Sequence, residues 1–130
     1  GWPLPLGGVR NRRSLVALDN LVDLLVVCMA HPAAANQVLL ISDGEPMSTP
    51  ELLRGIGRAL GRPARLVGVP PIWLKAGASL VRRPAIYERL CGSLEVDDAA
   101  TRQLLQWRPP VSVDQALAAT ARWFLAERHL

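Results

Sequence analysis

The sequence of 130 residues contains few aromatic residues and almost no lysine. Aromatic side chains make up 5% of the chain, so a hydrophobic core has to be built mainly from Leu, Val and Ala. Lys75 is the only lysine among 15 basic residues, and arginine therefore supplies nearly all of the positive charge. A guanidinium matches phosphate oxygens better than an ammonium group does, so this bias favours phosphate binding. A GC-rich coding bias would produce the same composition.

The chain is also poor in cysteine and in long apolar runs. Cys28 and Cys91 are too few for a disulfide framework, and both lie in apolar stretches, so we expect buried free thiols in a reducing cytoplasm. The longest apolar stretch, Leu15–Ala30, is interrupted by two aspartates and an asparagine and does not predict a membrane span. The chain starts without Met or a signal peptide, inside an apparent loop, so we expect a part of a longer protein.

Nucleic-acid and metal binding are not favoured by the residues present. The net charge of +4 is modest, and the arginines are scattered rather than gathered with aromatic residues on one stretch. Cys28 and His31 are possible zinc ligands, but the second pair that a zinc site needs is missing. The length corresponds to one domain, and we treat residues 1–130 as a single region.

Short apolar runs predict three β-strands in the first half of the chain. The run QVLLIS between the Ala/Asn-rich segment and Asp43-Gly44 is typical of a strand buried on both faces. The other two runs are shorter but also rich in aliphatic residues. The three predicted strands are Arg13–Leu18, Gln37–Ser42 and Arg65–Val69.

Two predicted helices alternate with these strands. The first is apolar on most sides, is capped by Asp19 or Asn20, and ends at His31-Pro32. The second starts at Ser48, with Glu51 completing a capping box, and runs to about residue 60. This alternation predicts an α/β fold with a few short, mostly parallel strands.

The second half of the chain is predicted to be mostly helical. Helices are expected over Ile72–Val81, over Ala85–Cys91, and from a cap at Asp97 or Asp98 to residue 105. A capping box formed by residues 112 and 115 starts a last helix that ends near residue 128, and Trp107 is expected to pack against that helix. Together these helices predict a helical lobe beside the strands, an arrangement that suits a ligand site at the strand ends.

The ordered set of motifs resembles the C-terminal part of extended short-chain dehydrogenases/reductases that act on nucleotide sugars, a group that includes UDP-glucose 4-epimerases. The matching stretches are PLPLG, NRRSLVALDNLVDLL, VLLISDGEPMSTPELL and SLEVDDAATRQLLQWRPP. The resemblance implies a Rossmann-type fold and a helical substrate-binding lobe. Within the group, NRRSLV and RLCGSL are most similar to enzymes of bacterial O-antigen sugar synthesis, among them 4-ketoreductases.

The resemblance also implies roles for five residues. Leu4 and Leu6 fall in the segment whose backbone contacts uracil, although this segment could equally be a simple edge strand. Arg12 or its neighbour Arg13 matches the arginine that grips the pyrophosphate, and a solvated basic loop is the alternative. Arg89 lies near the position of a second phosphate-binding arginine, at a slightly different spacing.

The chain departs from the family in lacking the glycine-rich dinucleotide loop and the Tyr-x-x-x-Lys pair. Tyr87 is followed by Glu-Arg-Leu-Cys and is given no catalytic role. We therefore expect NAD or NADP to belong to the parent protein, with none bound to these residues. The expected partners are a UDP-sugar, the N-terminal Rossmann half of the parent and a further copy of the protein in a homo-oligomer.

Two rival hypotheses remain. The chain could be a non-catalytic nucleotide- or protein-binding domain derived from the same fold. It could also associate with a membrane surface through IWLKAGASLV, with Trp73 and Lys75 at the interface, although we regard membrane binding as the weaker hypothesis. Because the apolar strands and the first helix would lack part of their partner layer, we also expect an exposed apolar face and self-association.

Overall fold

The computed structural model describes residues 3–128, and 53% of these residues are helical. The described part contains six α-helices and one short 3-10 helix, joined by extended segments. Their bounds are α1 Leu18–Ala30, η1 Pro32–Ala34, α2 Thr49–Ala59, α3 Pro71–Leu80, α4 Pro84–Cys91, α5 Ala99–Leu105 and α6 Val113–Glu127. The ends of each helix lie within one or two residues of the predicted ends, apart from η1, which was not predicted, and the start of α1.

Local capping chemistry explains where the helices begin. Ser48 accepts a hydrogen bond from the Glu51 N–H, and the Glu51 side chain accepts from the Ser48 N–H, so the predicted capping box of α2 is confirmed. Ser112 and Gln115 form the same reciprocal pair at α6. These side chains satisfy N–H groups that the first turn of a helix cannot pair within itself.

The predicted cap of α1 by Asp19 or Asn20 is wrong. The helix begins at Leu18, and both residues lie inside its first turn. The acceptor comes instead from a distant loop, because the Asp43 carboxylate receives the Ala17 N–H at 3.0 Å. At α5 the N-cap residue is Asp98, but its side chain forms no capping hydrogen bond. The carboxylate of Asp97 before it accepts the Ala99 N–H at 3.0 Å, so only the Asp97 alternative has such a contact.

The three predicted strands do not form a sheet among the described residues. Single bridges join Leu4 to Leu66, and Arg13 to Met47 and Leu94. Gln37–Ser42 is extended but forms no bridge, and Val38 is 94% exposed rather than buried. A strand is stabilised by hydrogen bonds to a neighbouring strand, and residues 3–128 offer none beside this segment. The α/β expectation is therefore not met by the described part, which is helices linked by extended chain.

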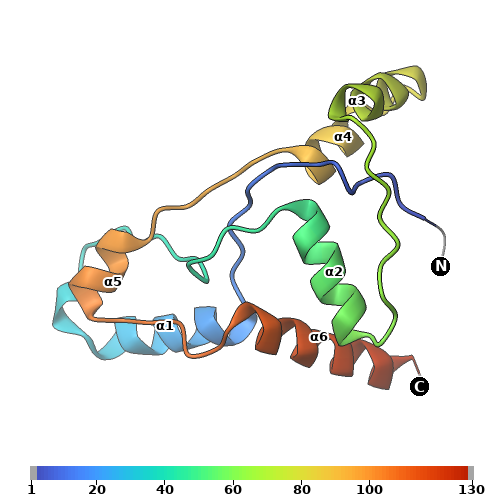
Figure 1. The fold of residues 1–130 in the computed structure, drawn as a ribbon. Coiled ribbons are helices and arrows are strands. Elements are labelled where there is room, and N and C mark those ends of the chain that lie inside the picture. Colours follow the sequence, from blue (N-terminus) through green and yellow to red (C-terminus); the bar gives the residue numbers. More distant parts are fainter. Residues whose placement is uncertain (1–2, 129–130) are drawn as a thin grey trace.

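Figure 1 shows an open arrangement of the helices. α1 and α6 lie along one side, and α2 packs across α6. α5 and η1 lie at the far end of α1, whereas α3 and α4 form a pair at the opposite corner. Long extended segments run between these groups.

The buried core lies between α1, α5 and the extended segment before Asp43. It contains Leu24, Leu105 and Trp107, with Leu39 and Ile41 packed against them. The Trp107 indole N–H donates to the Asp23 carboxylate at 2.8 Å, so the buried ring keeps its polar atom satisfied. Trp107 is thus a packing anchor as expected, but its partners are α1 and α5 rather than the last helix.

Many large apolar side chains remain exposed. The outer face of α1 carries an apolar stripe made of Leu18, Val22, Leu25, Val26 and Met29, all of them exposed. This confirms the expectation of an open apolar face, while self-association stays a prediction. Cys28 and Cys91 are half-buried free thiols. None of the helices over residues 3–128 is long and apolar enough to cross a membrane.

Candidate functional site

The arginine pair lies in an extended segment held by backbone hydrogen bonds on two sides. On one side, the Leu94 N–H donates to the Arg12 carbonyl at 2.9 Å, and the Ser14 N–H donates to the Leu94 carbonyl at 2.7 Å. On the other, Arg13 and Met47 exchange two hydrogen bonds of 2.8 Å. The backbone that presents the two guanidinium groups is therefore fixed by segments distant in sequence.

The two arginine side chains have different environments. The Arg12 Nε–H pairs with the Glu95 carboxylate at the surface, and the Arg12 side chain is 67% exposed. The Arg13 guanidinium donates to the Arg89 carbonyl at the C-terminal end of α4. A cation there complements the negative end of the helix dipole and satisfies an unpaired carbonyl. Arg12 therefore offers an accessible charge, whereas Arg13 is tied to α4.

Arg89 joins the same region through its backbone. Arg89 lies in the last turn of α4 and is exposed, and its carbonyl oxygen accepts a hydrogen bond from the Arg13 guanidinium. The structure thus brings together the three arginines that the resemblance singles out, with the contact to Arg89 made by its carbonyl rather than by its guanidinium.

Leu4 and Leu6 lie in a different set of contacts. The Leu4 N–H donates to the Arg65 carbonyl, and the Leu4 carbonyl accepts from Val67, both at 2.8 Å. The Leu6 carbonyl accepts from Val9 at 3.3 Å in the turn that follows. Both main-chain polar groups of Leu4 therefore form hydrogen bonds within the chain. This is expected for a simple edge strand, the alternative to a segment that contacts uracil.

The glycine pair after Leu6 packs tightly against the segment that follows α2. A Cβ atom on Gly8 would lie 2.7 Å from the Val69 carbonyl oxygen, and one on Gly7 would lie 3.0 Å from the Val67 carbonyl carbon. These glycines permit a close backbone approach within the chain. They do not form an open cradle, so they do not fit a dinucleotide phosphate.

Two asparagines have structural roles that were not predicted from the sequence, where Asn11 was not singled out and Asn20 was considered only as a helix cap. Asn11 is 4% exposed and connects the arginine segment to α2 and α4. Asn20 is fully buried and bonds to Asp43 and to both main-chain polar groups of Val111. The available sequence signal was weak, since each is only an asparagine next to an arginine or an aspartate.

The last residue of α4, Cys91, has a thiol that is shifted toward its protonated form. Burial, and secondarily the Glu88 carboxylate, raise the pKa of Cys91 above its usual value. A thiol with a raised pKa is a poor nucleophile at neutral pH. Cys91 is therefore a structural neighbour of the arginine cluster and not a reactive group within it.

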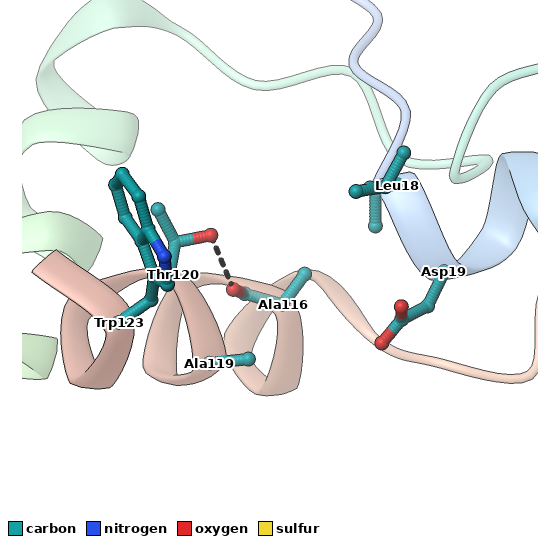
Figure 2. A pocket seen from close by; sticks show the side chains of 7 residues that line it. Leu18, Asp19, Ala116, Ala119, Thr120 and Trp123 are labelled. Carbon is teal, nitrogen blue, oxygen red and sulfur yellow. Dashed lines mark hydrogen bonds between the residues drawn. The ribbon is translucent and has the colours of Figure 1, made fainter.

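A separate groove lies between the start of α1 and α6. Its volume is about 440 Å³, and its lining is Ala17, Leu18, Asp19, Ala116, Ala119, Thr120 and Trp123. Figure 2 shows Leu18 and Asp19 on one side, and Thr120 and Trp123 on the other, with the Thr120 hydroxyl donating to the Ala116 carbonyl at 2.9 Å. The single charge in the lining is negative, which does not suit a diphosphate. Residues 3–128 also contain no cluster of three or more side chains able to hold a metal ion.

No family model matches the chain. A UDP-glucose 4-epimerase from Vibrio cholerae is 44% identical to it over 126 residues, which are 96% of this chain and 38% of that protein. The chain thus spans less than half the length of this relative. The similarity extends over nearly the whole chain, as the family resemblance does. The chain is therefore a C-terminal part of a protein that is similar to epimerases of the short-chain dehydrogenase/reductase type.

Proposed function

We propose that the chain is the UDP-sugar-binding part of an NAD(P)-dependent nucleotide-sugar 4-epimerase or 4-ketoreductase. The observation that carries this proposal is the arginine segment, in which Arg12 is exposed on a backbone fixed by residues 93–96 and Met47. The proposal extends to bacterial surface-polysaccharide synthesis, a cytoplasmic location and a homo-oligomer. These further points are supported by the family resemblance alone.

Arg12 is suited to hold the pyrophosphate of the nucleotide. Its contact to Glu95 uses Nε, and a guanidinium can present its other edge to two phosphate oxygens at once. Glu95 limits the positions that the long side chain samples, which reduces the entropy lost on binding. Arg13 contributes by joining the segment to α4, and Arg89 is the next source of positive charge.

Uracil recognition by this chain would involve Leu6 more readily than Leu4. The N–H and carbonyl of Leu4 already pair with Arg65 and Val67, so uracil could contact them only if that pairing were exchanged. Leu6 lies in the turn that leads to Val9 and is half-buried. Main-chain recognition needs no polar side chain, which is compatible with leucine at both positions.

The cofactor site is proposed to lie in the remaining part of the parent protein. The only paired glycines near a predicted strand, Gly7 and Gly8, are filled by the backbone of residues 67–69 and cannot cradle a pyrophosphate. No step of the reaction is therefore assigned to these residues. Their proposed contribution is to bind and orient the substrate, while the N-terminal Rossmann half supplies the reacting groups.

The test is UDP binding to the intact parent protein, measured by calorimetry. A charged hydrogen bond contributes about 1.5–3 kcal/mol, so Arg12→Ala should weaken UDP binding roughly 10- to 150-fold. Arg12→Lys should restore little of the lost affinity because the fork geometry is missing. Arg122→Ala changes an exposed arginine on α6 and is the matched control.

The outcome for the arginine pair decides the proposal. If Arg12→Ala and Arg13→Ala both leave UDP affinity unchanged in a folded protein, the pyrophosphate is not held by this segment. Weakening by Arg89→Ala in that case would move the phosphate site to α4. If UDP does not bind the parent at all, the alternative of a protein-binding domain is favoured.

A further inference from the structure

We infer that Asn11 is a positioning residue. It holds the arginine segment in the register and orientation in which the Arg12 guanidinium is available to bind phosphate. This inference rests on the proposed function, because it concerns how Arg12 is presented to UDP. Asn11 does not contact the proposed ligand position itself. It acts through the backbone of the next two residues.

The Asn11 side chain forms three hydrogen bonds in a buried position. Its Nδ2 donates to the Thr49 hydroxyl at 2.9 Å and to the Gly92 carbonyl at 2.8 Å, and its Oδ1 accepts the Thr49 N–H at 2.8 Å. The side-chain amide has two donors and an acceptor oxygen, so both kinds of group are used. With Asn11 4% exposed, water cannot easily replace these partners.

The partners of Asn11 belong to the ends of two helices. Thr49 is the first residue of α2, and Gly92 follows the last residue of α4. The Thr49 hydroxyl in turn donates to the Leu90 carbonyl, again at the end of α4. Helix ends have N–H and carbonyl groups without partners, and Asn11 with Thr49 supplies partners for both ends together. The arginine segment is thereby joined to α2 and α4 at one point.

The extended conformation transmits this connection to the arginines. Asn11 and Arg13 are two residues apart and both contact the C-terminal end of α4, whereas Arg12 between them contacts Glu95. Alternate residues of an extended chain point to opposite sides. A shift of one residue would exchange the environments of Arg12 and Arg13, so the buried Asn11 amide determines which arginine is exposed.

Other side chains cannot replace this combination. Aspartate would place oxygens against the Gly92 carbonyl, serine is too short to reach both helices, and leucine would leave the Thr49 N–H and the Gly92 carbonyl without partners. The position requires a donor that reaches the Gly92 carbonyl and an acceptor that reaches the Thr49 N–H, and the asparagine amide provides both.

The inference is tested by a double-mutant cycle with UDP on the full-length protein. Asn11→Ala should weaken UDP binding roughly tenfold in a protein that still unfolds cooperatively, since coupled residues interact by that order of magnitude. In an Arg12→Ala background the same change should have little further effect, because Asn11 acts through Arg12. A purely structural role would lower the melting temperature and leave the affinity of the folded protein unchanged.

A second substitution keeps the test decisive if Asn11→Ala fails to fold. Thr49→Val removes the hydroxyl but leaves the backbone N–H that donates to Asn11. It should also weaken UDP binding, and this effect should disappear in an Arg12→Ala background. Thr49→Ser should retain affinity, and Thr120→Val, at an exposed position on α6, is the matched control.

The possible outcomes separate this inference from the proposed function. If Arg12→Ala weakens UDP binding but Asn11→Ala and Thr49→Val do not, or if their effects simply add to that of Arg12→Ala, the positioning role is overturned. If Arg12→Ala and Arg13→Ala have no effect on UDP binding, the proposed phosphate site and the positioning role are both overturned.

Discussion

At the scale of single residues, buried asparagines hold together segments that are far apart in the sequence. Asn20 on α1 has 0% exposure, and its amide bonds to the Asp43 carboxylate at 2.8 Å and to the Val111 carbonyl and N–H at 2.9 Å. Asp43 in turn receives the Ala17 N–H at the start of α1. Asn20 therefore links α1, the loop before α2 and the segment that leads into α6.

We predict that Asn20→Ala destabilises the protein by about 2–3 kcal/mol, because the partly buried N–H and carbonyl of Val111 would lose their partner. Asn20→Asp should be more destabilising at neutral pH than at pH 4, since it places a second carboxylate against Asp43 and acid protonates the added side chain, whose pKa is raised by its like-charged neighbour. Chemical denaturation measures both effects. Gln37→Ala, at an exposed position, should change little, and an equal loss in that control would mean that the assay does not report on these bonds.

At the scale of secondary-structure elements, the helices follow from local sequence, whereas their packing depends on close approaches. Gly57 in α2 faces the chain that returns after Gly61, where a Cβ atom would lie 2.8 Å from both the Ala64 nitrogen and the Arg62 oxygen. Gly77 in α3 has no such neighbour within 4 Å of the position of a Cβ atom. The two helical glycines therefore differ in the space around them.

We predict that Gly→Ala substitutions at these two positions have opposite signs. Alanine is favoured over glycine in a helix by about 0.5–1 kcal/mol, so Gly77→Ala should stabilise α3. Gly57→Ala should lower stability, because the new methyl group meets backbone atoms that cannot rotate away. Differential scanning calorimetry of both variants decides the matter. A stabilising Gly57→Ala would show that α2 and the following loop are not packed as the structure describes.

At the scale of the whole molecule, apolar surface is left open. The core contains few large buried side chains, while the outer face of α1 displays a continuous apolar stripe in which Met29 is 88% exposed. A surface helix normally carries polar residues on its outer face. Exposed apolar patches of this kind mark surfaces that another part of the protein or another molecule covers.

We predict that residues 1–130 alone self-associate and bind a dye that reports exposed apolar surface. Replacing Leu25 and Met29 together by Glu should reduce dye binding and association without unfolding, because both side chains already face solvent. Light scattering and far-UV circular dichroism provide the measurements. Leu24→Glu is the contrast, since Leu24 is in the core and the change should unfold the chain. A monomeric wild-type chain without dye binding would contradict the prediction.

The sequence by itself determined the helices, their capping boxes and the family, because these depend on neighbouring residues or on the order of motifs. Ser48 with Glu51, and Ser112 with Gln115, are pairs three residues apart whose hydrogen bonds need no tertiary partner. It did not determine the strands, since Gln37–Ser42 has the composition of a buried strand but needs a neighbouring strand to pair with. Only the tertiary structure assigned Asp43 as the cap of α1, placed Arg12 and Arg13 in different environments, and identified Asn11 as their connection to α2 and α4. The partners in those contacts lie 26 to 83 residues apart, and no local pattern specifies which distant group will meet a given side chain.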